Sequence, residues 1–261
     1  FLELRKTGAG IHLPCVNNSD AYTNIRGNDV YMGFIHIKSL QQEMVEHLLQ
    51  QRENDGPYLS LVDFIERTAI TKEQLNMLVS VGALRFTGKT KKQLLWEANF
   101  LQAKIKSLTS ATPLFHEAPV NFTLPQLDDR RLDDLYDQIE LLDFPLANPF
   151  EMLEEDPDDF VYAEALPGNL GKVVTSLGYY IEQKGVRTIR NETMAFASFL
   201  DARLNWLDTV HFPPSLRQYP LRGKGFYKIT GKVVVDFGVY NIEVTKLIKL
   251  GIRERSWMEV R

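Results

Sequence analysis

Apolar residues recur with a helical period through the first part of the chain, and two short helices there carry clear start signals. Ser60 stands three residues before Asp63, and Thr71 stands three residues before Gln74. In this pattern a hydroxyl accepts from the backbone N–H three positions on, which begins a helix. Apolar positions continue through the second helix as far as Gly82, a residue typical of a helix end. We therefore expect a compact pair of helices here.

Two longer periodic stretches flank this pair. The first runs over residues 40–52, and Ser39 with Gln42 forms a further capping pattern at its start. The second runs over residues 91–106. We therefore expect residues 34–110 to form an all-helical domain.

Beyond residue 166 the apolar period changes to two, which is typical of strands. The expected strands cover residues 173–181, 194–200, 206–212, 227–235 and 240–244. Turns are expected at Lys184-Gly185 and at Asp236-Phe237-Gly238. Five short strands favour a small closed barrel of the OB type. The predicted fold class is α+β and multidomain, with an all-α domain followed by a five-stranded β-barrel.

Charge divides the chain into three stretches of different character. Residues 1–110 carry 13 basic against 11 acidic residues, residues 111–166 carry 2 against 15, and residues 167–261 carry 15 against 8. The middle stretch begins in a segment rich in Ser, Thr and Pro, and we interpret it as an acidic linker. The basic last stretch suggests a polyanionic partner. The single cysteine, Cys15, excludes an internal disulfide, and no apolar run is long enough for us to expect a membrane span.

Short motifs follow one another along nearly the whole chain. They are LPCVNNS at 13–19, GFIHIKS at 33–39, GPYLSLVDF at 56–64, LVSVGAL at 78–84, a turn at 141–153, and MAF at 194–196 with residues 207–213. Together, in this order and spacing, they resemble the C-terminal part of the catalytic α subunit of bacterial DNA polymerase III, a C-family replicative polymerase.

The resemblance implies an organisation in four parts and a set of partners. The parts are the end of the fingers at 1–33, a tandem helix-hairpin-helix domain at 34–110, a linker at 111–166 and an OB domain at 167–261. The implied partners are double- and single-stranded DNA, the sliding clamp and other replisome subunits, in the bacterial cytoplasm at the nucleoid. Family catalysis rests on palm carboxylates and a divalent metal, Mg²⁺, outside this stretch. We therefore expect a non-catalytic piece of a longer protein, without a cofactor of its own.

Basic residues near the two hairpins are the candidates for duplex contact. Lys and Arg that neutralise phosphates release counterions, which gives salt-sensitive binding without sequence preference. The first hairpin has Ser39-Leu40-Gln41 where the family has Gly-Val-Gly, so its side chains would hinder close approach to a phosphate. The second hairpin would then carry more of the binding. The plainer alternative is a solvated helical face. The candidates are Lys38, Ser39, Gln41, Arg85, Lys89, Lys91 and Lys92.

In the barrel, aromatic rings and cations are the candidates for single-stranded DNA. Base stacking on such rings is worth roughly 1–3 kcal/mol per base, and cations follow the backbone. The alternative is that most aromatic residues of a small barrel belong to its core. The candidates are Lys172, Tyr179, Tyr180, Lys184, Arg187, Arg190, Phe196 and Arg203.

In the linker, Leu114-Phe115 occupies the place where the family carries its clamp-binding motif. Two apolar anchors on an extended peptide suit a preformed groove. The family's Gln is replaced by Ala111, and a local packing contact is an equally open alternative.

Other chemistry finds little support in the sequence. Gly88-Lys89-Thr90 is not a P-loop, because the motif needs a glycine five residues before Gly88 and Ala83 stands there. The five histidines show no metal-ligand spacing, and the acidic run at residues 128–134 is read as the solvated start of a helix. A protein-interaction module that does not contact DNA remains the main alternative function. A nuclease comes third, since no catalytic constellation is evident.

Overall fold

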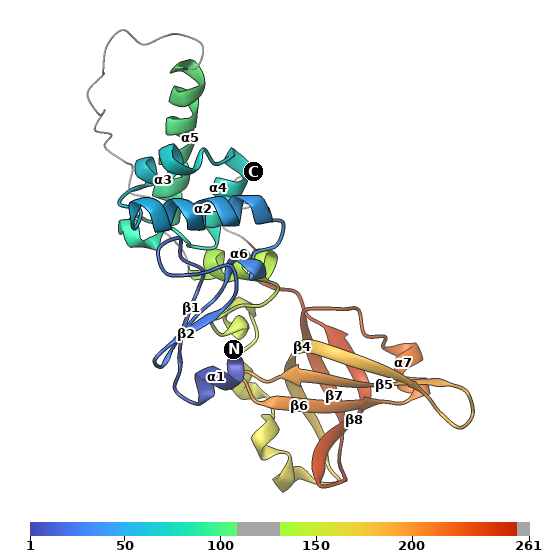
Figure 1. The fold of residues 1–261 in the computed structure, drawn as a ribbon. Coiled ribbons are helices and arrows are strands. Elements are labelled where there is room, and N and C mark those ends of the chain that lie inside the picture. The colour runs from blue at the N-terminus through green and yellow to red at the C-terminus, as the bar shows by residue number, and fades with distance from the viewer. Residues whose placement is uncertain (109–130, 255–261) are drawn as a thin grey trace. The chain divides into compact units, whose positions relative to one another are not determined.

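The computed structural model describes residues 1–108 and 131–254, and the chain divides into two compact units. One unit runs over Phe1–Leu146 and the other over Ala147–Arg261. Helices dominate the first, and a β-barrel dominates the second (Figure 1). We call them the helical unit and the barrel unit. The predicted α+β class, with a helical domain followed by a barrel, is confirmed.

The helical unit opens with a small sheet that the sequence pattern did not predict. Helix α1 (Leu2–Lys6) precedes strands β1 (Gly10–His12), β2 (Asn24–Arg26) and β3 (Asp29–Tyr31), which lie in the order β1-β3-β2. Strand β3 is parallel to β1 and antiparallel to β2. Strands of three residues are too short to display a period of two, so no alternation indicated them.

Four helices form the body of this unit. They are α2 (Gln42–Asp55), α3 (Leu61–Thr68), α4 (Lys72–Ser80) and α5 (Lys91–Leu108). Two predicted caps are confirmed: Ser60 Oγ accepts from Asp63 N at 3.1 Å, and Thr71 Oγ1 accepts from Gln74 N at 3.4 Å. Helix α4 stops as expected before Gly82, which has a φ of +79°.

The predicted cap at Ser39 is wrong. Helix α2 has Gln41 as its N-cap residue, without a capping side chain. Ser39 lies in the turn before the helix with a φ of +61°, a left-handed conformation that is uncommon for a residue with a side chain. This backbone conformation places Ser39 outside the helix start.

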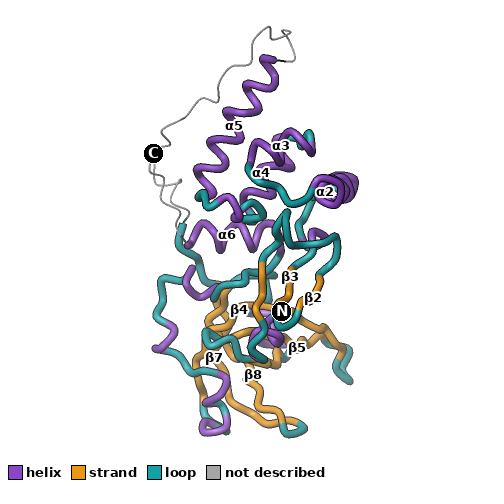
Figure 2. Tube along the Cα trace, turned by 60° about the vertical axis from the view of Figure 1, so that its left-hand side comes forward, coloured by secondary structure: helices purple, strands orange, loops and turns teal. Residues whose placement is uncertain are grey.

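Helix α6 (Arg131–Leu142) packs within the helical unit, although the sequence analysis assigned it to the linker. Leu135 and Leu142 are buried, and Leu142 joins the same apolar core as Leu48 and Phe64. Figure 2 shows α6 beside the N-terminal end of α5. The acidic stretch is therefore not one continuous connector.

The barrel unit begins with short 3-10 turns and then closes five strands into a barrel. The turns are η3 (Pro149–Met152), η4 (Pro157–Asp159), η5 (Ala163–Ala165) and η6 (Pro167–Asn169). The strands are β4 (Val173–Arg187), β5 (Thr193–Leu200), β6 (Trp206–His211), β7 (Phe226–Asp236) and β8 (Val239–Lys249), closed in the order β4-β5-β6-β8-β7. Only β6 and β8 pair in parallel among these neighbours. Helix α7 (Pro213–Gln218) lies between β6 and β7 in the sequence.

Glycine sets the closest approach of two strands in this barrel. A Cβ on Gly231 of β7 would stand 2.2 Å from the carbonyl oxygen of Glu243 on β8, so the strands can pair this closely only with glycine there. The turn predicted at Lys184-Gly185 is wrong, because β4 continues through both residues and the chain reverses after Arg187. Both residues pair with β5 in regular register, and such pairing outweighs a weak local turn signal.

No helix in the described part of the chain is long and apolar enough to cross a membrane.

Candidate nucleic-acid interface

Two hairpins connect helices in the helical unit. The first hairpin, residues 37–41, joins the 3-10 turn η1 (Phe34–His36) to α2. The second hairpin, residues 81–90, joins α4 to α5 and contains the turn η2 (Arg85–Thr87). Helix N-termini that follow such hairpins present backbone N–H groups, which suit anions such as phosphate.

The first hairpin is held by partners from elsewhere in the unit. The buried side chain of Gln74 spans it: its Nε2 donates to Ser39 O at 3.2 Å, and its Oε1 accepts from Gln41 N at 2.9 Å. Lys38 N donates to Leu141 O of α6 at 2.8 Å. Two backbone N–H groups of this hairpin, those of Lys38 and Gln41, are therefore engaged within the protein.

The second hairpin is closed by glycine turns and a complete capping box. Gly82 and Gly88 both have positive φ, +79° and +71°, which lets the chain turn sharply. Thr90 and Gln93 then cap α5 reciprocally: Gln93 N donates to Thr90 Oγ1 at 3.2 Å, and Thr90 N donates to Gln93 Oε1 at 3.0 Å. This cap was not predicted, although its T-x-x-Q pattern is present in the sequence.

Most of the predicted duplex-binding cations lie beside carboxylates. Lys38 Nζ is 2.5 Å from Asp143, and Lys89 Nζ is 2.6 Å from Glu97. The remaining pairs are Lys91 with Asp134 at 2.6 Å and with Asp137 at 2.9 Å, and Lys92 with Asp133 at 3.7 Å. Apart from Glu97, these acids belong to α6 or follow directly after it. The cationic face predicted from the sequence is thus largely neutralised within the unit.

Arg85 differs from the lysines, because no carboxylate within ion-pair distance is among its described contacts. The residue as a whole is exposed, but its guanidinium folds against Gly82, where a Cβ would stand 2.8 Å from Nη1. This partial burial lowers the pKa of Arg85, which still leaves the group charged at neutral pH. Glycine at position 82 thus also makes room for the arginine.

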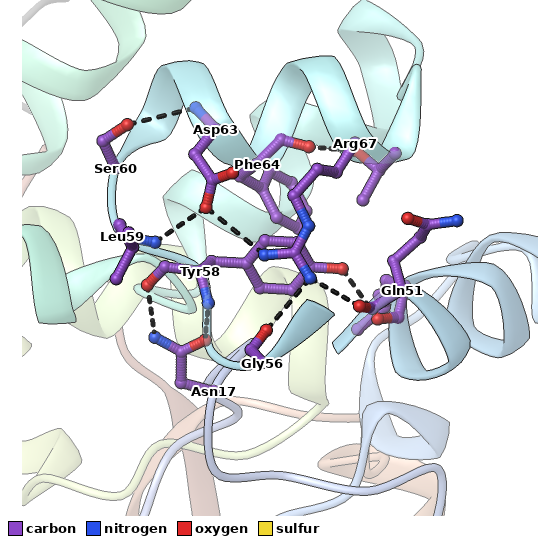
Figure 3. A network of polar contacts seen from close by, with 11 residues as sticks. Asn17, Gln51, Gly56, Tyr58, Leu59, Ser60, Asp63, Phe64 and Arg67 are labelled. Carbon is purple, nitrogen blue, oxygen red and sulfur yellow. Dashed lines mark hydrogen bonds and ion pairs between the residues drawn. The ribbon is translucent and has the colours of Figure 1, made fainter. Parts of the chain in front are cut away.

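A polar network behind the hairpins fixes the chain between α2 and α3 (Figure 3). The amide of Asn17 pairs with both backbone groups of Tyr58, at 2.8 and 2.9 Å, and the Tyr58 hydroxyl donates to Leu48 O at 2.7 Å. The Arg67 guanidinium lies over the Tyr58 ring at 4.3 Å and donates to Gly56 O at 3.0 Å. Burial raises the pKa of Tyr58 to about 12. The network ties the segment between α2 and α3 to Asn17 and to both helices, and its long-range partners were not predicted from the sequence.

The aromatic candidates of the barrel unit separate into core and surface. Tyr179 is buried against the ring of Phe226, so its ring face is closed to a base. Tyr180 is half-buried and packs edge-on against Phe199 of the core. Phe196 is 44% exposed and lies in register with Lys184 of β4, so an exposed ring and a cation are neighbours on one face.

The basic candidates of the barrel unit also differ in their surroundings. Arg203 forms an ion pair with Glu164 and lies over the Tyr162 ring at 4.1 Å, which engages it locally. Arg187 donates to Asn191 Oδ1 at 2.6 Å across the β4–β5 turn. Arg190 is exposed in that turn, and Lys172 is exposed just before β4.

Two exposed apolar residues at strand turns were missed. Ile189 lies in the β4–β5 turn and Phe237 in the β7–β8 turn, and each is fully exposed. In OB folds the loops at these two places flank the ligand-binding face formed by the second and third strands. Trp206 and Phe212, at the two ends of β6, are also partly exposed, and β6 is the strand that pairs with β5. The turn at Asp236-Phe237-Gly238 was predicted, but its phenylalanine was not read as a site.

Leu114 and Phe115, the predicted clamp anchors, lie outside the described residues. Within the described ranges, no group of three or more His, Cys, Asp or Glu side chains is arranged to hold a metal ion.

Comparisons with known proteins agree with the hairpin geometry. Residues 8–94 match a family model described as a helix-hairpin-helix motif. An error-prone DNA polymerase from Mycobacterium tuberculosis is 33% identical over 98 residues, which cover 37% of this chain and 9% of that protein. The DNA polymerase III subunit alpha of Staphylococcus epidermidis is 24% identical to this chain, over 84% of this chain and 21% of that protein. The DNA polymerase III subunit alpha of Aquifex aeolicus is 28% identical to this chain, over 82% of this chain and 18% of that protein.

The chain therefore spans about a fifth or less of the length of these curated relatives. The family-model match includes both hairpins, and the matches to the two alpha subunits cover most of the chain. The resemblance drawn from the sequence motifs is thereby confirmed: over most of its length, this chain is similar to the α subunit of bacterial DNA polymerase III.

Proposed function

We propose that this chain positions DNA for a replicative polymerase, with duplex on the helical unit and single-stranded template on the barrel unit. The observation that carries the proposal is the helix-hairpin-helix match over residues 8–94, in a chain that continues into a five-stranded barrel. Hairpins of this kind suit phosphate through backbone N–H groups and nearby cations. The second hairpin, with Arg85 at its surface, is the stronger candidate for duplex contact.

On the barrel unit, the proposed path crosses the face of β5 and β6 between two turns. Phe196 and its neighbour Lys184 supply a ring and a charge, and Arg190 and Phe237 stand in the flanking turns. Rings that stack on bases and cations that follow the backbone together bind single strands with little sequence preference.

Two further roles are proposed on the sequence motifs alone. Leu114 and Phe115 would attach the chain to a sliding clamp, and other surfaces would meet further replisome subunits in the bacterial cytoplasm, at the nucleoid. Nucleotide addition, with its divalent metal, is assigned to parts of the relatives that this chain does not span. The chain itself would act by positioning.

A protein-interaction module without DNA contact is the second candidate. The pairing of Lys38, Lys89, Lys91 and Lys92 with the unit's own carboxylates favours it, because paired cations release fewer counterions. The two candidates differ in one measurable property, which is salt-dependent affinity for DNA.

The test is a titration of the chain with a short duplex and with a single strand of equal length, at several salt concentrations. Positioning of DNA predicts binding to at least one form, with an affinity that falls steeply as salt rises. The absence of binding to either form at low salt would favour the interaction module. A preference for the single strand would place the main site on the barrel unit, and substitution of Lys184 and Arg190 by Gln should then remove most of it.

A further inference from the structure

Helix α6 brings a row of carboxylates to the start of α5. Asp134 and Asp137 both contact Lys91 Nζ, at 2.6 and 2.9 Å, and Asp133 lies 3.7 Å from Lys92 Nζ. Lys91 and Lys92 are the first two residues of α5, where the second hairpin ends. A carboxylate row therefore stands where a phosphate bound to that helix start would be.

The other end of α6 reaches the first hairpin. Asp143, directly after the helix, lies 2.5 Å from Lys38 Nζ, and Leu141 O accepts from Lys38 N at 2.8 Å. One helix thus supplies an anion to both hairpins. Its carboxylates and its carbonyl oxygen engage the same kinds of donor, ammonium and backbone N–H, that bind a DNA phosphate.

Apolar packing and a buried amide also hold α6 in this place. Leu135 and Leu142 are almost fully buried, and Gln138 is 7% exposed and accepts from Leu146 N at 2.7 Å. Two of the carboxylates lie at the edge of the contact, with the side chains of Asp134 and Asp143 43% and 49% exposed, whereas those of Asp133 and Asp137 are each 18% exposed. The more exposed pairs contribute little to stability, and the more sheltered ones are weak evidence for stability, because the cost of desolvating both charges offsets their attraction.

We propose that α6 is an intramolecular competitor of duplex DNA, whose carboxylates occupy the cationic face of both hairpins. This inference rests on the proposed duplex binding by the helical unit. Any partner that draws α6 away, or neutralises its carboxylates, would strengthen the grip of the helical unit on duplex.

The test compares the chain with a variant carrying Asp133→Asn, Asp134→Asn and Asp137→Asn. The matched control carries Glu53→Gln, Asp55→Asn and Glu66→Gln, which makes the same change of charge at exposed positions of α2 and α3. The α6 variant should bind a short duplex at least about tenfold more tightly than the control at low salt. Its plot of log affinity against log salt should steepen by about 0.9 for each freed cation. Addition of Lys91→Met to the α6 variant should abolish most of the gain.

A gain no larger than that of the control would overturn the inference. Should the triple variant fold poorly, Asp143→Asn serves in its place, because Asn tolerates the φ of +70° at this position and keeps the side-chain shape. Its gain should disappear on adding Lys38→Gln, with Glu66→Gln as its control. If neither the chain nor any variant binds duplex at low salt, duplex binding itself fails; if all bind equally, only the competitor role fails.

Discussion

The helical unit and the barrel unit present their cations in opposite ways. In the helical unit Lys38, Lys89, Lys91 and Lys92 each lie beside a carboxylate of the same unit. In the barrel unit Lys184 and Arg190 are exposed on a strand and in a turn, and the exposed ring of Phe196 lies beside Lys184. A count of basic residues would rank the units by charge alone. The structure shows that the availability of the charges is a separate property.

Two buried polar side chains, one in each unit, differ in how fully they are paired. Gln74, buried beneath the first hairpin, uses both its amide oxygen and its amide nitrogen on backbone partners. His211, fully buried in the barrel, uses Nε2 toward Thr209 at 2.9 Å, while its Nδ1 has no partner among the described residues. A paired group holds its surroundings rigid, whereas an unpaired one is a weak point.

The largest effect is expected on the barrel unit when the pH falls. Burial lowers the pKa of His211 to about 4, from an ordinary value of 6.5. Because the unfolded chain takes up a proton first, the contribution of neutral His211 is complete above pH 6.5 and is lost progressively as the pH falls toward 4. The difference between the two pKa values corresponds to about 3 kcal/mol. Hydrogen exchange of the β5 and β6 amides should therefore accelerate sharply from pH 7 to 4.5, after correction for intrinsic exchange.

The control for this prediction is His211→Gln, which removes the titration and keeps a polar side chain. Its barrel should be less stable at pH 7 but should lose less stability on acidification. An equal loss in both proteins would assign the acid sensitivity to carboxylates elsewhere. The α3 and α4 amides provide an internal reference in the other unit.

The sequence predicted elements where local signals act alone. Ser60 and Thr71 cap their helices because a hydroxyl three residues before the receiving N–H needs no distant partner. The five barrel strands were predicted because each is long enough to alternate. The failed cap at Ser39 and the failed turn at Lys184-Gly185 lie where distant partners decide the backbone: Gln74 in the first case and pairing with β5 in the second.

The candidate site was predicted less well for the same reason. Lysines near the second hairpin were identified from their position in the sequence, but the partners of Lys91 and Lys92 come from α6, more than 40 residues away in the chain. The burial of Tyr179 and the exposure of Phe196 follow from which strand face turns inward. A local pattern fixes that face only when alternation is strict, and β4 is buried at four successive positions, 176–179.

A smaller effect is expected from the aromatic face of the barrel unit. Phe196→Ala should weaken binding of a single strand by about 1–3 kcal/mol, because it removes a stacking surface. The matched control is Ile248→Ala. Ile248 is an apolar residue of comparable exposure on β8, a strand that does not pair with β5. Fluorescence anisotropy with a labelled oligonucleotide measures both. Equal losses in the two variants would mean that Phe196 has no special place on the path of the strand.

The smallest effect is expected at the first hairpin, and it tests how far that hairpin is fixed by its backbone rather than by its charges. Ser39 holds a φ of +61°, which costs a residue with a Cβ about 1 kcal/mol, and glycine would adopt it without strain. Part of this gain is offset because glycine has more freedom in the unfolded chain. Ser39→Gly should therefore raise the free energy of unfolding of the helical unit by a few tenths of a kcal/mol, measured by urea denaturation.

Ser39→Ala is the control: it removes the hydroxyl but keeps the strained Cβ, so it should give no gain. If the alanine variant is stabilised as much as the glycine variant, the hydroxyl and not the backbone is the unfavourable feature of this turn. Because the Gln74 amide contacts only backbone atoms of Ser39 and Gln41, both variants keep the lock on the hairpin, and duplex affinity should rise in neither.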